Sequence, residues 1–177
     1  YNDAASAIME YFWNEFCDWY VEATKLSFKN GDEHEKDRAV SVLLNVLEEN
    51  LRLLHPFLPF VTEEIYSKLP LKEITENRAK VGTCNVLSNS TYSSMLINAP
   101  FPEVMEMRKN DEVTERFDVL KDLIGKIRAL RTECGLDPAS KINIAILITP
   151  NSPAEVCREK VEMIQLLAGV AKVEFVQ

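Results

Sequence analysis

FWNEFCDWYVEATK, residues 12–25, lies within a longer segment whose apolar side chains recur at every third or fourth position. This spacing is typical of an α-helix that buries one side. Polar residues gather on the opposite face, namely Asn14, Asp18, Lys25 and Lys29. We therefore expect a long helix whose polar face is open to water or to a partner. The recurring apolar residues are Tyr1, Ala5, Ile8, Phe12, Phe16, Trp19, Ala23 and Leu26.

A second helix follows the first. Residues 30–32 (Asn-Gly-Asp) interrupt the first pattern, and a new apolar stripe of the same period runs through residues 39–54. Asn50 falls inside that stripe, where an unpaired buried amide costs about 1–3 kcal/mol. We therefore expect Asn50 to have a hydrogen-bond partner inside a helical bundle.

Two prolines in residues 54–66, LHPFLPFVTEEIY, separate the second helix from a third. Pro59 suits the first turn of that helix, which is expected to end near Leu69, before Pro70. Glu63 and Glu64 lie in its early turns, where the helix dipole favours negative charge. Neighbouring side chains do not face each other on a helix, so the pair predicts neither a metal site nor an acid catalyst.

A fourth helix and a small α/β segment complete the expected fold. The apolar period predicts a helix from about Asp111 to Cys134, closed by Gly135. Residues 141–148 (KINIAILI) and 172–176 (KVEFV) are typical of strands, and Asn-Ser-Pro at 151–153 predicts a helix start between them. The fold class is mainly α, with residues 1–110 as a helical bundle. Residues 111–177 form its last helix and a strand-helix-strand appendage.

Composition is that of a globular protein without a membrane span. The 177 residues are 46% hydrophobic and 27% charged, which is typical of a globular chain. No apolar run approaches the roughly 18 residues of a membrane span. The chain starts at a Tyr rather than a Met and enters a helical pattern at once, so we expect a fragment of a longer polypeptide.

Neither a metal nor a catalytic motif is found in the sequence. The four cysteines, Cys17, Cys84, Cys134 and Cys157, form no C-x-x-C pair, so they predict no zinc site and are typical of a reducing compartment. The two histidines lie in no H-E-x-x-H motif, and five glycines form no phosphate loop. We expect no catalytic residue, no metal ligand and no cofactor in this chain.

The charge is unevenly distributed. A formal net charge of -8 argues against a simple nucleic-acid binder, because phosphate contacts draw on Lys and Arg. Residues 121–141 nevertheless hold five basic side chains against three acidic ones. A basic face on an acidic domain is therefore expected there.

Three segments resemble the carboxy-terminal tRNA-binding part of valyl-tRNA synthetases, in the same order. They are residues 12–25, residues 54–66, and IRALRTE at 127–133 with the Lys-Ile pair at 141–142. Isoleucyl- and leucyl-tRNA synthetases share the bundle and a version of HPFxPF. Residues 15–22 and 127–133 resemble the valyl branch more closely. The family usually has a Pro-rich, Lys-rich turn where this chain has Ala-Ser-Lys at 139–141.

The resemblance implies that separate domains of a longer enzyme carry out catalysis and tRNA binding. In the family, a class I catalytic domain of Rossmann type activates valine with ATP and transfers it to tRNA, and a helical bundle downstream holds the anticodon stem and loop. The signature motifs of that catalytic core are absent from this sequence. The chain thus resembles a class I anticodon-binding helical bundle with a small α/β appendage, inactive as a ligase on its own.

The resemblance also gives expectations for individual residues. Asn14 and Asp18 are expected to read base edges. The residues expected to contact RNA phosphates are Lys25, Lys29, Arg128, Arg131 and Lys141. Phe12, Phe16 and Trp19 lie in the apolar stripe and are expected in the core, whereas Trp13 and Tyr20 lie toward its edge.

The expected partners are valine-accepting tRNA and the catalytic domain of the same polypeptide, in a cytoplasmic monomer without a membrane contact. Two alternatives stay open. One is the corresponding domain of an isoleucyl- or leucyl-type synthetase. The other is a helical protein-interaction module, which the negative net charge of the chain favours.

Overall fold

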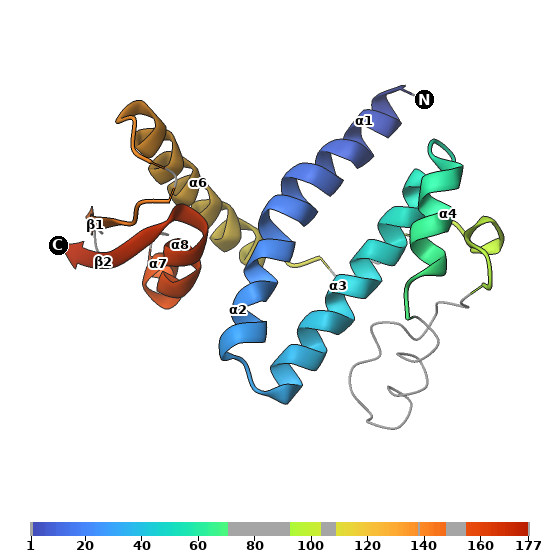
Figure 1. Cartoon of the computed structure of the whole chain (residues 1–177), viewed down its shortest axis with the longest axis horizontal. Coiled ribbons are helices and arrows are strands. Elements are labelled where there is room, and N and C mark those ends of the chain that lie inside the picture. Colours follow the sequence, from blue (N-terminus) through green and yellow to red (C-terminus); the bar gives the residue numbers. More distant parts are fainter. Residues whose placement is uncertain (1, 71–92, 104–108, 138, 148–154, 177) are drawn as a thin grey trace. The chain divides into compact units, whose positions relative to one another are not determined.

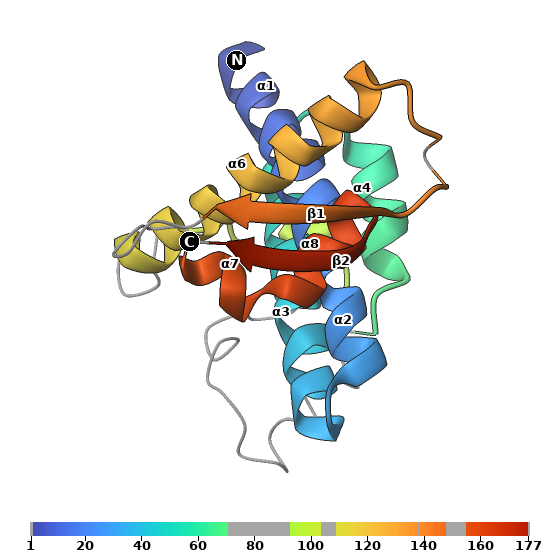
Figure 2. The same ribbon diagram turned by 90° about the vertical axis from the view of Figure 1, so that its left-hand side faces the viewer.

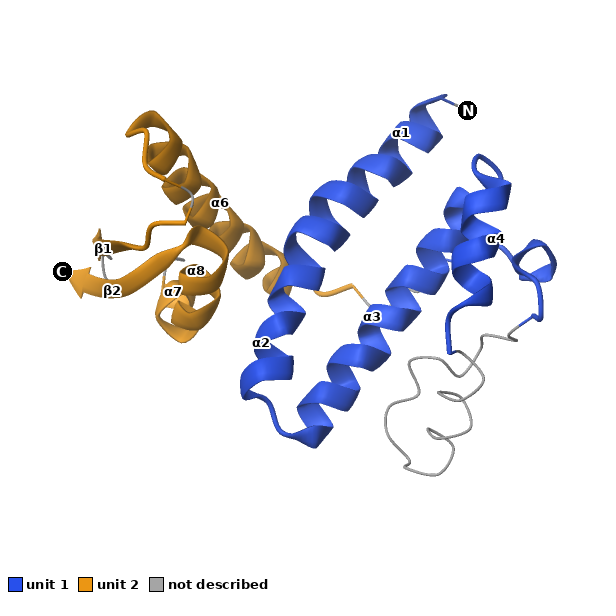
Figure 3. Ribbon diagram, in the orientation of Figure 1, with its two compact units in different colours: residues 1–104 blue, residues 105–177 orange. Residues whose placement is uncertain are grey.

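The computed structural model describes residues 2–70, 93–103, 109–137, 139–147 and 155–176. The chain divides into two compact units, residues 1–104 and residues 105–177 (Figure 3). The sequence had suggested a division after residue 110. Mainly helical structure with a small two-stranded sheet confirms the expected fold class.

Unit 1 begins with one uninterrupted helical stretch (Figure 1). It consists of the α-helix α1 (Asn2–Glu10), the π-helical segment η1 (Tyr11–Val21) and the α-helix α2 (Glu22–Asn30). The rings of Phe12, Phe16 and Tyr20 stack in series along η1, with centroids 5.5 and 6.1 Å apart. The predicted long helix is confirmed, and it continues to Asn30.

The break predicted at residues 30–32 joins α2 to α3 (Glu33–Leu54). Gly31 follows the last residue of α2, and the carboxylate of Asp32 accepts a hydrogen bond from the Glu35 N–H at 2.8 Å. An Asp in this position caps a helix because it satisfies one of the N–H groups that lack a partner within the first turn. The chain therefore reverses, and α3 runs back along α2 (Figure 1).

The expected hydrogen-bond partner of Asn50 is present for its amide nitrogen and absent, among the described residues, for its amide oxygen. Asn50 is buried in α3, and its amide nitrogen donates to the Val46 carbonyl at 2.7 Å. Its Oδ1 atom has no hydrogen-bond partner within the described part of the chain. The bonded carbonyl belongs to the same helix, so Asn50 does not link two helices through this bond.

The third helix, α4 (Pro59–Ser67), starts at Pro59 as predicted. It packs against α3 and against a short 3-10 turn, η3 (Leu96–Asn98). Leu51, Tyr66 and Leu96 form the buried cluster that joins these three elements. Each of the three elements thus contributes one residue to this cluster.

Unit 2 begins with α6 (Asp111–Glu133), whose bounds confirm the predicted fourth helix. The Asn110 side chain caps its start by accepting from the Val113 N–H at 3.1 Å. Gly135 ends it with φ of 62°, and the Leu136 N–H returns to the Arg131 carbonyl at 3.0 Å. A left-handed residue with this bond is the Schellman motif, which favours glycine.

The rest of unit 2 is a parallel two-stranded sheet with helices between its strands. The strands are β1 (Ile142–Leu147) and β2 (Val170–Val176), which lie side by side in Figure 2. The helices are α7 (Val156–Glu159) and α8 (Val161–Ala168), and α8 packs on α6. Both predicted strands are confirmed. The predicted helix start at 151–153 lies outside the described residues.

Candidate nucleic-acid interface

One group of expected RNA-contacting residues lies on the long helix of unit 1. Asn14, Asp18, Lys25 and Lys29 are all exposed there, as expected. The ammonium of Lys25 contacts the Glu22 carboxylate at 2.6 Å, and both side chains reach solvent. An exposed pair of this kind contributes at most about 1 kcal/mol, so an incoming phosphate can replace it cheaply.

Two aromatic residues on the same helix have opposite environments. Phe16 is 4% exposed and belongs to the core, whereas Trp13 is 57% exposed. The Trp13 ring meets Phe12 edge to face, with centroids 5.9 Å apart, and its surface is open. The indole is next to Asn14 in sequence. Sequence reasoning placed Trp13 at the edge of the stripe but left it out of the site.

Arg128 and Arg131 on α6 of unit 2 were also expected to contact phosphates, and the two side chains differ in exposure. Arg128 is exposed, and its Nε atom donates to the Leu167 carbonyl at 2.8 Å. Arg131 is only 8% exposed. The two side chains border the same cavity of about 350 Å³, but only Arg128 is exposed at the surface.

Arg131 donates to four backbone carbonyls. Its Nη1 atom reaches Gly169 at 2.7 Å and Ala168 at 3.4 Å, and its Nη2 atom reaches Ser140 at 2.7 Å and Asp137 at 3.2 Å. A buried guanidinium needs such partners, because an unpaired buried charge is strongly destabilising. This environment does not fit contact with a phosphate. Lys141, one residue beyond Ser140, is exposed.

The two units differ in charge. Residues 1–104 hold nine Lys and Arg against 16 Asp and Glu, a net of -7, whereas residues 105–177 hold 11 against 12, a net of -1. Phosphate contact is therefore electrostatically less unfavourable on unit 2. An RNA contact on unit 1 would depend more on hydrogen bonds and stacking than on charge.

The adjacent glutamates of α4 have different roles. Glu63 accepts hydrogen bonds from the Leu96 and Ile97 N–H groups, whereas Glu64 pairs with Lys68 in solvent. That pairing lowers the pKa of Glu64 through its hydrogen bond and the charge of Lys68. No cluster of metal-ligating side chains occurs among the described residues. These glutamates are structural.

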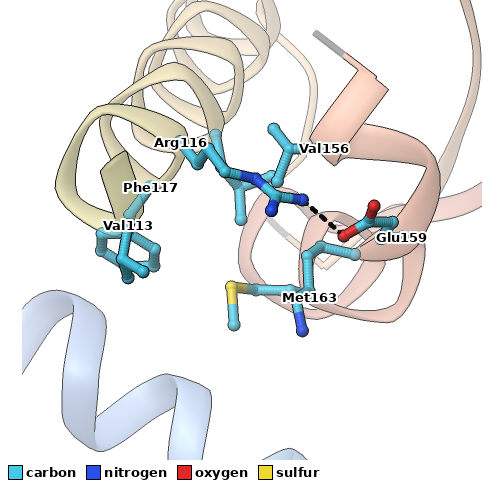
Figure 4. A pocket seen from close by; sticks show the side chains of 8 residues that line it. Val113, Arg116, Phe117, Val156, Glu159 and Met163 are labelled. Atoms are coloured by element: carbon cyan, nitrogen blue, oxygen red, sulfur yellow. Dashed lines mark hydrogen bonds and ion pairs between the residues drawn. The ribbon is translucent and has the colours of Figure 1, made fainter. Parts of the chain in front are cut away.

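A cavity in unit 2 offers no catalytic arrangement. It has a volume of about 260 Å³, and Val113, Phe117 and Met163 give it apolar walls (Figure 4). Arg116 and Glu159 face each other across its rim at 2.8 Å. Burial raises the pKa of the nearby helix residue Cys157, so that thiol is not an activated nucleophile.

In the parts of the chain that the structure describes, no helix has the length and apolar content of a membrane span.

The mainly helical fold with its small two-stranded sheet is the one expected of an anticodon-binding domain of the tRNA ligases. A family model described as "Anticodon-binding domain of tRNA ligase" matches residues 1–146, and the chain belongs to that family. Among its relatives is the valine--tRNA ligase of Treponema denticola, 51% identical over 176 residues that cover 99% of this chain and 18% of the relative.

Two further relatives cover the whole chain. The valine--tRNA ligase of Treponema pallidum is 38% identical over 193 residues, and that of Fervidobacterium nodosum is 33% identical over 177 residues. The matched part is 19% and 17% of their lengths. The chain thus spans about a fifth of the relatives it matches, and these relatives support the valyl branch over the isoleucyl and leucyl branches.

Proposed function

We propose that this chain binds valine-accepting tRNA through the anticodon stem and loop, as the anticodon-binding part of a valine--tRNA ligase. The parent enzyme would attach valine to that tRNA with ATP, and the catalytic core would lie outside these residues. The family match carries this proposal. The exposed polar and aromatic face of the first helix of unit 1 supports it.

Each exposed residue has a role in the proposal. RNA loops are read by stacking unpaired bases on aromatic planes and by hydrogen bonds to base edges. Trp13 would supply a stacking surface, and Asn14 and Asp18 would meet base edges. Lys25, Lys29, Arg128 and Lys141 would hold phosphates. Arg131 is left out of the contact set because its donors face backbone carbonyls.

The remainder of the parent polypeptide is the second proposed partner. On α4, Phe60 is 89% exposed, and Val61 and Ile65 are also exposed. Neighbouring apolar side chains of this kind are typical of a surface covered by another protein part. Their occupant would be the catalytic domain of the same chain, in a cytoplasmic monomer. Cys17, Cys134 and Cys157 are free thiols, which supports a reducing compartment.

A helical protein-interaction module is the second candidate function, because unit 1 is strongly acidic. The two functions differ in their response to salt. Binding to RNA phosphates releases counterions and weakens steeply as salt rises. A chain that bound no tRNA at any salt concentration would favour the protein-interaction function.

Fluorescence anisotropy with a labelled valine tRNA transcript tests the proposal. We expect binding that weakens when the anticodon bases are changed in an otherwise identical transcript. Arg128→Gln should reduce the slope of log affinity against log salt by about one, which corresponds to the loss of one phosphate contact. Lys126→Gln is the matched control, because Lys126 is an exposed cation on the same helix, paired with Asp122 at 2.6 Å. Equal affinity for valine and unrelated tRNAs would contradict sequence-specific binding.

A further inference from the structure

The guanidinium of Arg131 joins two separate parts of unit 2. Asp137 and Ser140 belong to the connection between α6 and β1, whereas Ala168 and Gly169 end α8 and lead into β2. One side chain therefore joins the end of its own helix to the segments that lead into both strands of the sheet. We refer to Arg131 and its four carbonyl partners as the carbonyl clamp.

Gly169 shows that the clamp is built closely around the guanidinium. A Cβ atom at this position would lie 3.0 Å from Nη1 and 3.3 Å from Cζ of Arg131. Gly169 also has φ of 64°, in the left-handed region that favours glycine. Lysine carries a compact ammonium on a flexible stem, so it cannot reproduce the planar fork that reaches four carbonyls.

The clamp also lies next to two exposed cations of unit 2 that the proposed function assigns to phosphates, Arg128 and Lys141. Arg128 donates through Nε to the Leu167 carbonyl, directly before the Ala168 and Gly169 carbonyls that Arg131 holds. Ser140, whose carbonyl accepts from Arg131 at 2.7 Å, directly precedes Lys141. The Gly169 carbonyl accepts from the Ile142 N–H at 3.3 Å as well. One buried residue thus holds the backbone directly before Lys141 and the backbone directly after the carbonyl that binds Arg128.

We infer that Arg131 is a positioning residue for RNA binding: it does not touch RNA, and it holds Arg128 and Lys141 in the arrangement that meets phosphates. The inference rests on the proposed function. It differs from direct contact by Arg131, because a phosphate contact needs an accessible cation whereas positioning needs the four carbonyl bonds. It also gives Gly169 a role in RNA binding, although Gly169 has no charge.

Two variants separate positioning from charge. Arg131→Lys keeps the charge and loses the fork, and Gly169→Ala keeps every cation and displaces the guanidinium. In anisotropy titrations of the 177-residue chain with a valine tRNA transcript, both should weaken binding about tenfold. Both should also reduce the slope of log affinity against log salt by up to about two, which corresponds to the loss of two phosphate contacts. Wild-type affinity for Arg131→Lys would overturn the positioning role.

A double-mutant comparison and a folding measurement complete the test. In the Arg128→Gln, Lys141→Gln background, adding Arg131→Lys should weaken binding no further, because the residues it positions are gone. An additive loss would mean that Arg131 contacts RNA itself. Hydrogen exchange of the β1 and β2 amides reports whether unit 2 stays folded. If both clamp variants unfolded the sheet, Arg131 would serve stability alone and the inference would fail.

The unsubstituted chain distinguishes this inference from the proposed function. If it bound no tRNA, the proposed function would fall and the positioning role with it. If it bound tRNA, and Arg128→Gln weakened binding while the clamp variants did not, only the positioning role would fall.

Discussion

Glu63 on α4 accepts a hydrogen bond from the backbone N–H of Leu96, 33 residues further along the chain, at 2.9 Å. Its second oxygen accepts from the Ile97 N–H at 3.3 Å. One carboxylate therefore caps the start of η3 and holds Leu96 in the cluster with Leu51 and Tyr66. Glu64, the next residue, has no such contact and pairs with Lys68 at the surface.

Glu63→Ala should destabilise unit 1, because it removes the acceptor of two N–H groups. A hydrogen bond to a charged group contributes about 1.5–3 kcal/mol, and we expect a loss of that size in the free energy of unfolding. Both tryptophans of the chain, Trp13 and Trp19, lie in unit 1, so urea unfolding followed by tryptophan fluorescence reports on this unit. Glu64→Ala is the matched control and should change little. Equal losses would mean that the cap is unimportant.

A buried ion pair on α3 predicts an unusual pH dependence. Glu48 and Arg52 approach to 2.8 Å with side chains 3% and 9% exposed, and Arg52 also donates to the Pro100 carbonyl. Burial raises the pKa of Glu48 above its ordinary value of 4.5, and the charge of Arg52 only partly opposes this. The folded state therefore binds the proton more tightly than the unfolded state, and this contribution to stability is lost as the pH rises above 4.5.

Comparison with Glu48→Gln isolates that contribution, because the variant does not titrate at this position. The free energy of unfolding of the wild type, minus that of the variant, should fall as the pH rises from about 4 through the raised pKa, and then level off. Fluorescence-monitored urea unfolding at a series of pH values measures it. A difference that increased with pH would mean that Arg52 outweighs burial and that the pKa is lowered.

Alanine substitution of Gly125, within α6, and of Gly135, at its end, should change the stability of unit 2 in opposite directions. Gly125 lies in the exposed middle of the helix, where an added Cβ meets no atom within 4 Å, so Gly125→Ala should stabilise unit 2 by about 0.5–1 kcal/mol. Gly135 has φ of 62°, so Gly135→Ala should cost about 1–2 kcal/mol. Hydrogen exchange of the α6 amides measures both changes. Stabilisation by Gly135→Ala would contradict the left-handed helix end.

Local sequence signals predicted most of the helix boundaries. Asp32, Pro59 and Gly135 each mark a boundary because their chemistry acts within one turn of the backbone, and each lies where expected. The strands were also predicted, because alternation is a property of neighbouring residues. The parallel pairing of β1 with β2 was not, since it depends on contacts between residues about 28 apart.

The candidate site was predicted less completely, for the same reason. The exposure of Asn14 and Lys29 follows from helix period, which sequence reveals. The burial of Arg131 depends on the carbonyls of Ser140 and Gly169, which only folding brings to it. A buried arginine and an exposed one, three residues apart on the same helix, have no distinguishing local pattern. Gly169, which leaves room for the guanidinium, was the available signal.

Trp13 and Phe16 provide the last prediction, because they are aromatic residues on one helix with different exposure. Stacking of an unpaired base on an aromatic ring contributes about 1–3 kcal/mol, so Trp13→Ala should weaken binding of the valine tRNA transcript by roughly 5- to 150-fold. It should leave stability nearly unchanged, because Trp13 is 57% exposed. Phe16→Ala empties part of the core and should cost about 3–5 kcal/mol of stability. Far-UV circular dichroism measures unfolding without relying on the removed indole, and anisotropy measures binding. Unchanged tRNA affinity in Trp13→Ala would remove this ring from the proposed surface, whereas loss of folding would show that the indole supports the core.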